Sequence, residues 1–530
     1  MNRRSRSKDF WPQIALLVGA VALIVTVSPC VATSNASLAE SAGGGPEIVK
    51  DINPAGDSRP ASLAAFDNTL YFVADDGSHG WELWKSDGTD AGTVLVIDIK
   101  TGEEHSFTSQ LTEMDGSLYF SADDGLHGRE LWRSDGTEMG TAMVGDINPA
   151  GHSVPWDLTV LDSTMFFGAD DGVHGGELWR TDGTDAGTVM VKDINPAGPS
   201  FPEVLAVLDD DLLFLADDGE HGRELWKSDG TETGTMLVKD INPNGSCRSD
   251  SPLYYWDVTA VVSDTLFFRA KDDTSGVELW KTDGTEGGTM RVRDIHEGND
   301  SSYPHSFAVV GGTLFFTADD HDHGHELWKS DGTEDGTDMV ADIRPGRGDS
   351  YPDDLTNMNG TLFFRARDSE NGMELWKSDG TATGTVMVKD INPEVSPDGP
   401  MFLTVAGEVL YFSAKHSLYG TELWRSDGTE LGTFMLEEIR PTIEGSWPTS
   451  LTVIDETLFF VANDGTHGEE LWKLDTSVPM PSRVAYFPMI LRRQDCFRVI
   501  REGIRTSRSG FSLRTPGKGD SFRVRVPCRR

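Results

Sequence analysis

The sequence predicts an all-β fold, a closed β-propeller of nine four-stranded blades. The tripeptide Glu-Leu-Trp occurs nine times at steps of 47 to 54 residues, which indicates one structural unit copied nine times. Each copy contains short apolar runs separated by turn residues, and the last copy is split between the two ends of the array. The repeated tryptophans are Trp84, Trp132, Trp179, Trp226, Trp280, Trp328, Trp376, Trp424 and Trp472.

The third copy shows how one unit is expected to fold. Its apolar runs cover residues 157–161, 165–169, 177–180 and 189–194, and they are rich in Val, Phe, Leu and Trp. Turns rich in Gly and Asp separate the runs, and Asn-Pro-Ala-Gly at 195–198 ends the unit. No run has a helical period. Four short antiparallel strands in a unit of this length are typical of a propeller blade.

The two ends of the array predict that the ring closes. The ninth copy stops near Asp475 and lacks its fourth strand, and a matching run stands at the other end, at 47–52. One circularly shifted strand would complete the last blade and remove two exposed sheet edges. Nine blades exceed the usual number, about four to eight. Two smaller rings are therefore the alternative, although no linker divides the array.

The segments outside the array predict secretion. Residues 1–8 contain four basic side chains, and an apolar run from 14 to 27 and small residues follow, as in a secretory signal peptide. A permanent membrane anchor is the alternative, but the run is short for a span. After cleavage no stable transmembrane domain would remain. The expected organisation is a signal peptide at 1–36, a spacer at 37–47, the propeller at 48–476, a linker with a sorting-like motif at 477–491 and a basic disordered tail at 492–530.

Charge and cysteine content restrict the function. The chain has 45 Lys and Arg against 87 Asp and Glu, a net charge of −42, and twelve of the basic residues lie in the tail after residue 491. A repeat region this acidic repels phosphate backbones, so nucleic acid is not an expected partner. The four cysteines do not recur with the repeat, so no disulfide or zinc framework holds the blades.

The repeated motif itself is interpreted as structural. The Trp of each copy lies on the third strand, where a large aromatic fills the space between blades. Glu82 alternates with Leu83 and shares a face with Trp84. Nine buried carboxylates would be costly unless each accepted hydrogen bonds, and we expect backbone amides or hydroxyls of the same or the next blade to donate them. Asp-Gly-Thr at 87–89 is a tight-turn sequence.

A second repeated turn, Asp-Asp-Gly-x-His-Gly, is a candidate metal site. It and the Asn-Pro-Ala-Gly connection are expected at the same end of the ring, which would carry a circle of carboxylates and histidines. Oxygen-rich turns on a secreted protein could hold Ca²⁺, although the spacing matches no EF-hand loop and a plain turn is the alternative. The candidate ligands are Asp75, Asp76, Asp123, Asp124, Asp170, Asp171, Asp217 and Asp218.

Two features break the repeat and are candidate ligand sites for that reason. In the sixth copy the second turn contains His321, His323 and His325, and alternate histidines on one side of a strand could bind a transition metal. A drifted turn with exposed histidines is the alternative. An insertion at 246–256 contains Tyr254-Tyr255-Trp256, which are candidate contacts for a sugar or a peptide.

The sequence Glu-Leu-Trp-x-x-Asp-Gly-Thr resembles the bacterial ELWxxDGT repeat family, whose members are sometimes labelled hyalin-like. All nine copies carry Glu-Leu-Trp and eight carry Asp-Gly-Thr, and the resemblance covers about residues 48–475. It implies a secreted or surface-exposed protein without an established catalytic activity. Residues 486–492 also resemble a short C-terminal sorting motif of some secreted bacterial proteins, but here the chain continues for 38 residues beyond it.

The leading functional hypothesis is a secreted or cell-surface, non-catalytic scaffold that binds an extracellular protein or glycan. The chain has no nucleotide-binding Gly loop, no Gly-x-Ser-x-Gly elbow and no His-Glu-x-x-His, so we assign no catalytic residue. The rival hypothesis is a carbohydrate- or peptide-active hydrolase or lyase that uses carboxylates in the propeller channel. The fold alone does not decide between them.

Overall fold

The computed structural model describes residues 44–248, 258–394 and 396–478, together with three short strands at 505–507, 510–514 and 521–524. The predicted signal peptide, the sorting-like motif at 486–492 and the aromatic residues 254–256 lie outside the described residues. No helix in the described part of the chain is long and apolar enough to cross a membrane.

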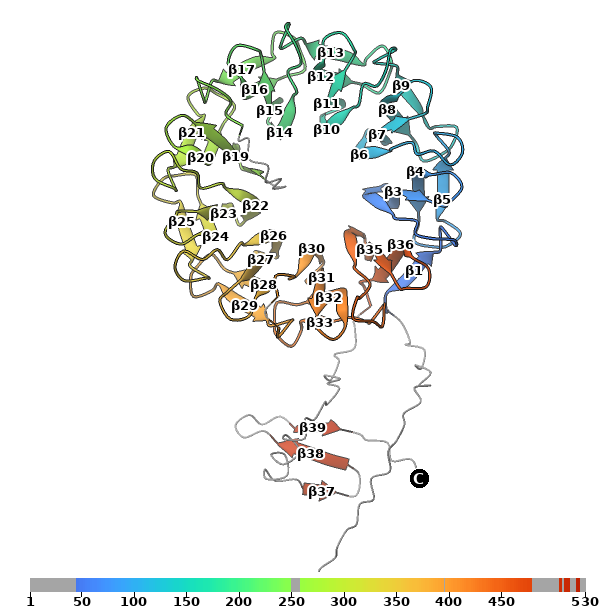
Figure 1. The fold of residues 1–530 in the computed structure, drawn as a ribbon, viewed down its shortest axis with the longest axis vertical. Helices are drawn as coiled ribbons and strands as arrows, with labels where there is room; N and C mark the ends of the chain where they lie inside the picture. The colour runs from blue at the N-terminus through green and yellow to red at the C-terminus, as the bar shows by residue number, and fades with distance from the viewer. Residues whose placement is uncertain are drawn as a thin grey trace, which may run out of the picture. The chain divides into compact units, whose positions relative to one another are not determined.

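The repeat region forms a closed ring of nine four-stranded antiparallel sheets, each a blade of a β-propeller (Figure 1). This confirms the predicted fold and blade number. Within each blade the strands follow one another in sequence order, except in the ninth, where β1 is the outer strand. The first strand of each blade lies nearest the centre of the ring, and the fourth lies at its circumference (Figure 1).

The strands of the first five blades have equivalent lengths in most copies. They are β2 (Ala61–Phe66), β3 (Thr69–Asp75), β4 (Trp81–Ser86) and β5 (Val94–Ile97); β6 (Ser109–Met114), β7 (Ser117–Asp123), β8 (Arg129–Ser134) and β9 (Ala142–Gly145); β10 (Trp156–Leu161), β11 (Thr164–Asp170), β12 (Gly176–Thr181) and β13 (Val189–Lys192); β14 (Glu203–Leu208), β15 (Asp211–Asp217), β16 (Arg223–Ser228) and β17 (Met236–Lys239); and β18 (Thr259–Val262), β19 (Thr265–Asp272), β20 (Gly276–Thr282) and β21 (Met290–Arg293).

The last four blades continue the same pattern. They are β22 (His305–Val310), β23 (Thr313–Asp319), β24 (His325–Ser330) and β25 (Asp338–Ala341); β26 (Asp353–Met358), β27 (Thr361–Arg367), β28 (Met373–Ser378) and β29 (Val386–Lys389); β30 (Met401–Ala406), β31 (Val409–His416), β32 (Gly420–Ser426) and β33 (Phe434–Met435); and β34 (Thr449–Ile454), β35 (Thr457–Asn463) and β36 (Glu469–Asp475), completed by β1 (Glu47–Lys50).

The N-terminal strand closes the ring, as the split ninth copy predicts. β1 pairs antiparallel with β36, where Glu47 lies opposite Lys473 and Ile48 opposite Trp472. The Lys473 ammonium also lies 3.0 Å from the Glu47 carboxylate. The innermost strands β2 and β34, from the first and last blades, are in contact. Because β1 supplies the missing edge, the first and last blades meet as any other two neighbours do.

The core consists of apolar clusters between blades rather than one central core. In the cluster at the closing junction, Trp84 and Phe72 of the first blade pack with Phe459 and Leu471 of the ninth. The other eight clusters likewise combine residues of two successive blades. Each repeated Trp therefore belongs to an inter-blade cluster, the arrangement that stabilises one blade against the next.

Three further strands lie within the range that composition predicts to be disordered. β37 (Arg505–Ser507), β38 (Gly510–Arg514) and β39 (Ser521–Val524) form a three-stranded antiparallel sheet. The sequence of β38 alternates apolar and polar residues, Phe-Ser-Leu-Arg, which is the period of a strand. The prediction of disorder rested on the basic composition of residues 492–530 and did not take this short alternation into account.

The ring has two ends that differ in their loops. We call the end that carries the segments between blades, such as 98–108, and the turns between second and third strands, such as 75–80, the connector face. We call the opposite end, which carries the hairpin turns between first and second strands and the Asp-Gly-Thr turns, the turn face. Antiparallel pairing places these loops at alternate ends of each blade.

Candidate functional site

The Asp-Gly-Thr turns of the turn face are closed by their own hydrogen bonds. In the third blade the Asp182 carboxylate accepts the backbone N–H of Thr184 at 2.9 Å and its hydroxyl at 2.7 Å. Gly187 N donates to the same Thr184 hydroxyl at 3.0 Å, and Gly183 takes a φ of 86°. The seven other copies repeat this network. These polar groups are therefore used in folding the blade.

The Glu of each Glu-Leu-Trp lies buried beneath the connector face and holds the following connector. One carboxyl oxygen of Glu177 accepts the amide of Ile194 at 3.0 Å and the hydroxyl of Ser200 at 2.7 Å, and the other accepts the amide of Ser200 at 2.9 Å. Glu470 makes the equivalent bonds to Ile52 and Ser58, so it anchors the N-terminal closing strand. The expectation that these carboxylates accept amide and hydroxyl hydrogen bonds is confirmed.

Burial controls the protonation of these glutamates. Removal from water raises the pKa of Glu82, Glu224, Glu278, Glu326, Glu422 and Glu470 to about 7 and the pKa of Glu374 to about 8, against opposing hydrogen bonds. A protonated Glu177 also has a hydrogen-bond partner. Its carboxyl O–H can donate to Ser200 Oγ, because the Ser200 hydroxyl can then donate to the Gly176 carbonyl oxygen. Perturbed carboxyl groups here have a structural role.

Two half-buried carboxyl groups on innermost strands, Asp157 and Asp354, are also structural. Burial raises the pKa of Asp157 and of Asp354, and each carboxylate accepts an amide of the next blade's first strand. The bonds run from Val204 N at 3.3 Å and from Leu403 N at 2.9 Å. Each group thus ties two innermost strands together, and a neighbouring carboxylate, Glu203 for Asp157 and Asp353 for Asp354, adds to the raised pKa.

The Asp-Asp-Gly-x-His-Gly turns use their carboxylates within the turn. Asp75 accepts the amide of Gly77 at 2.7 Å, and one oxygen of Asp76 accepts the amides of Ser78 and His79, both at 2.9 Å. The other oxygen lies 2.8 Å from the His79 ring. Partial burial raises the pKa of Asp76, but these hydrogen bonds outweigh it and the net shift is downward. The Asp76 carboxylate in turn raises the pKa of His79.

The same arrangement recurs at the other predicted calcium ligands, Asp123, Asp124, Asp170, Asp171, Asp217 and Asp218. Asp123 additionally lies 3.0 Å from the Lys100 ammonium. Within the described residues, no three His, Cys, Asp or Glu side chains gather as ligands of one ion. The calcium hypothesis thus has no cluster of ligands among the residues that the structure describes.

The three histidines of the sixth blade do not share a site. His323 Nδ1 lies 2.8 Å from Asp320, and His325 Nδ1 lies 3.2 Å from Asp349. His321 instead neighbours His296, with ring centroids 5.2 Å apart. Only His325 belongs to a strand, β24; the other two lie in the turn before it, so strand alternation does not apply to them. The structure therefore disperses these candidates among different partners.

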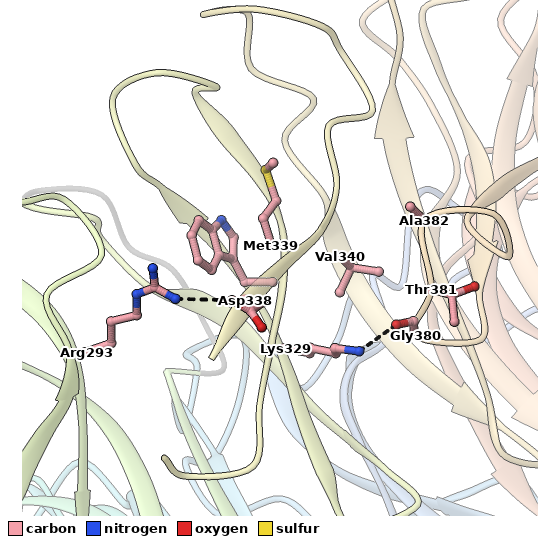
Figure 2. Close-up of a pocket in the computed structure, with 9 residues that line it drawn as sticks. Arg293, Lys329, Asp338, Met339, Val340, Gly380, Thr381 and Ala382 are labelled. Atoms are coloured by element: carbon pink, nitrogen blue, oxygen red, sulfur yellow. Dashed lines mark hydrogen bonds and ion pairs between the residues drawn. The ribbon is translucent and has the colours of Figure 1, made fainter. Parts of the chain in front are cut away.

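A crevice between blades six and seven, near the turn face, has a volume of about 580 Å³. Figure 2 shows Arg293 beside Asp338, and Lys329 reaching Gly380 of the next blade. The Lys329 ammonium donates to the Gly380 carbonyl oxygen at 2.9 Å. The same bond recurs between other blades, for example from Lys85 and from Lys281. This crevice is thus a copy of a repeated inter-blade contact.

The connector face carries a different kind of feature, a series of bulky side chains on a left-handed backbone. We call these seven positions the rim residues; each lies two residues before the first strand of a blade begins and follows a buried Ser. Their φ angles lie between 44° and 53°. The four apolar ones Phe107, Val154, Phe201 and Trp447 are exposed by 42–54%, and Arg59 is exposed as well. The rim residues are Arg59, Phe107, Val154, Phe201, Tyr303, Tyr351 and Trp447.

The left-handed backbone at these positions lets two successive amides hold one carbonyl group. Ser200 N and Phe201 N both donate to the Gly176 carbonyl oxygen, at 3.0 and 2.9 Å, and Ser350 N and Tyr351 N hold the His325 carbonyl oxygen in the same way. This conformation costs a non-glycine residue about 1–2 kcal/mol, whereas glycine adopts it freely. The backbone contact explains the conformation but not the aromatic side chains.

The rim aromatics lie among polar side chains. The Lys100 ammonium and the Arg129 guanidinium lie 5.8 and 5.4 Å from the centre of the Phe107 ring, and His105 lies between Phe107 and Trp81. Near Phe201, the indole of Trp156 donates to the Pro202 carbonyl oxygen at 2.9 Å. The connector face therefore presents apolar rings and hydrogen-bonding groups side by side, the composition of a recognition surface.

The rim residues are not among the sites predicted from the sequence, although the sequence carries a signal for them. In six copies the residue lies between Ser and Pro, directly before the first strand, as in Ser200-Phe201-Pro202 and Ser446-Trp447-Pro448. The residue type varies between Arg, Val and aromatics, so repetition of the letters does not draw attention to it. The positive φ that distinguishes the position is visible only in the structure.

No protein-family model and no curated protein matches this chain. Among solved structures, puromycin hydrolase is similar over 79% of this chain and 60% of its own, with 13% identity and a TM-score of 0.37. A structure from a study of two prolyl endopeptidases is similar over 76% of this chain and 52% of its own, with 14% identity and a TM-score of 0.37. A Mycobacterium tuberculosis puromycin-hydrolyzing peptidase is similar over 67% of this chain and 57% of its own, with 13% identity and a TM-score of 0.33.

This chain thus spans between 52% and 60% of the length of these three proteins. Because the TM-scores and identities are low, the similarities indicate nothing about the activity of this chain.

Proposed function

We propose that this protein is a secreted or cell-surface, non-catalytic binding scaffold of the ELWxxDGT repeat family, and that its partner docks on the connector face. The observation that carries the proposal is the set of rim residues, four of which keep bulky apolar side chains exposed on a backbone that glycine would adopt without strain. An observed backbone outlier of this kind is a reason to infer a functional constraint.

The other polar groups of the ring support this assignment by elimination. The Glu residues, the Asp-Gly-Thr turns and the Asp-Asp-Gly turns each satisfy hydrogen bonds inside the fold. The exposed rim aromatics have no such structural requirement, and large aromatic side chains dominate the energetics of binding surfaces. A rigid ring that presents them at several blade junctions suits a binding scaffold better than a catalytic centre.

The proposed docking face is testable with matched variants. Full-length protein, labelled and applied to arrays of extracellular proteins and of glycans, is expected to bind a partner that Phe201→Ala and Trp447→Ala weaken. The control is Met139→Ala, because Met139 is 99% exposed on an Asp-Gly-Thr turn of the opposite face. Equal weakening by the control, or no effect of the rim variants on any bound partner, would remove the connector face as the site.

Two further measurements test the remaining parts. Fractionation of producing cells is expected to find the protein outside the cytoplasm with its N-terminus beginning after the 1–36 segment; an intact N-terminus inside the cell would overturn secretion. Incubation with labelled polysaccharides and peptides is expected to release no product. Release that survives purification would favour the hydrolase or lyase alternative.

A further inference from the structure

The rim residues occur at separate blade junctions. Phe201 is 54% exposed and Trp447 50% exposed, and they belong to the connectors before the fourth and the ninth blades. The connector-face cavity near Phe107 has a volume of about 340 Å³, and its side chains include Lys100, Asp123 and His152. A folded protein partner usually needs a contiguous apolar centre, and these features do not supply one.

The rim aromatics Phe107 and Phe201 have hydrogen-bonding groups within reach of a ligand stacked on them. Phe107 lies beside His105, Lys100 and Arg129, and the carbonyl oxygen of Phe107 accepts from Arg129 at 3.0 Å. A ligand that suits this setting has an apolar face for the ring and polar groups at its edge. Sugar rings have both, since their C–H groups lie on one face and their hydroxyls project from the edge.

The charge of the chain selects among polysaccharides. With a net charge of −42, the protein repels polyanions over a distance of about 8–10 Å at ordinary ionic strength. Carboxylates at the connector face, such as those of Glu103 and Glu104, accept hydrogen bonds from uncharged hydroxyls without this penalty. A neutral polymer is therefore favoured over an acidic one.

We infer that the connector face binds a neutral polysaccharide chain, which stacks on rim aromatics at several blade junctions at once. This inference rests on the proposed binding function and adds the class of ligand. Because each junction that carries a rim aromatic offers only one, a single contact is weak, and affinity comes from simultaneous contacts along one chain. Linked contacts of this kind raise affinity by about 10²–10⁴ over a single one.

The test is affinity electrophoresis and calorimetry of the full-length protein with hydroxyethyl cellulose and galactomannan as neutral polymers, short oligosaccharides of the same linkages, and alginate as a polyanion. We expect a neutral polymer to bind at least about 10²-fold more tightly, per binding chain, than its short oligosaccharide. The double variant that carries both Phe201→Ala and Trp447→Ala is expected to bind the polymer about tenfold more weakly. Met139→Ala with Leu431→Ala, exposed apolar residues of the turn face, is expected to leave it unchanged.

The outcomes distinguish failure of the polysaccharide inference from failure of the proposed binding function. Absence of binding to both neutral polymers, or tighter binding to alginate, overturns the inference. Capture of an extracellular protein that depends on Phe201 and Trp447, without polysaccharide binding, overturns the inference but supports the binding function. Polysaccharide binding that the turn-face variants weaken as much as the rim variants overturns the connector face as the site. Circular dichroism of each variant checks that the ring is folded.

Discussion

The Asp-Gly-Thr turns of one face and the rim positions of the other use glycine and non-glycine residues in opposite ways on left-handed backbone. On the turn face, the left-handed positions of the Asp-Gly-Thr turns are glycines, such as Gly183 with a φ of 86°, and the neighbouring polar groups are all hydrogen-bonded. On the connector face, the left-handed positions before the first strands carry Phe, Tyr, Trp, Val and Arg. The first choice minimises strain and the second accepts it.

This difference separates what builds the ring from what is available for recognition. The turn face repeats one sequence in eight copies, and each copy closes its own network. The connector face repeats a backbone geometry but varies the side chain placed on it. A scaffold with a constant backbone and variable exposed side chains is the arrangement in which binding residues are usually found.

Gly183→Ala is expected to destabilise the protein by about 3 kcal/mol, through the left-handed backbone and overpacking together. An added Cβ would lie 2.2 Å from the Tyr119 hydroxyl oxygen of the preceding blade. The matched control is Gly198→Ala on the connector side, where an added Cβ meets nothing within 4 Å. Chemical denaturation measures both. Similar stabilities for the two variants would contradict a special role for glycine in these turns.

Glu177→Gln is expected to lower stability by about 2 kcal/mol, because one buried donor loses its acceptor. Both carboxyl oxygens of Glu177 accept backbone amides, from Ile194 and from Ser200. In either orientation the new NH₂ group would therefore face an N–H. The control is Glu220→Gln at an exposed position of the next blade. An unchanged melting temperature for Glu177→Gln would exclude the proposed role of the carboxylate.

Stability is expected to fall as the pH rises from 5.5 to 8.5. Burial raises the pKa of Glu224 and Glu470 to about 7 and that of Glu374 to about 8, from 4.5. A raised pKa in the folded state means that the stabilisation is complete below pH 4.5 and is lost as the pH passes through 7 to 8. The Asp76 carboxylate raises the pKa of His79, which acts in the same direction.

Melting temperatures recorded across this range would check the sign, and a constant or rising value would contradict it. Glu374→Gln supplies the matched comparison, because it removes the group with the highest raised pKa and should flatten the dependence. Below about pH 4 the opposite trend is expected, since the Asp76 pKa is lowered in the fold and its contribution is lost on protonation.

Phe201→Gly is expected to change stability by less than about 1 kcal/mol, because relief of the left-handed strain offsets the greater freedom of glycine in the unfolded chain. The same substitution removes an exposed ring and should weaken partner binding. Gly183→Ala, by contrast, should lower stability. A large loss of stability for Phe201→Gly would show that this ring supports the fold rather than recognition.

Much of the architecture was predictable because it depends on local patterns that are repeated. The spacing of Glu-Leu-Trp and the split ninth copy predicted nine blades and the pairing of β1 with β36, which the structure confirms. The hydrogen bonds of Glu177 followed from the cost of burying a carboxylate. The metal hypotheses rested on residue type alone, and the structure instead shows that Asp76 and His323 bond within their own turns.

The sequence by itself determined the repeat, the four strands of each unit and the circular shift that closes the ring, because strand alternation and turn chemistry act between residues close in the chain. Only the tertiary structure decided which polar groups remain available. That depends on partners far apart in sequence, as when Ser58 meets Glu470 across the closure. It also depends on backbone angles such as the left-handed φ of Phe201, which residue letters do not record.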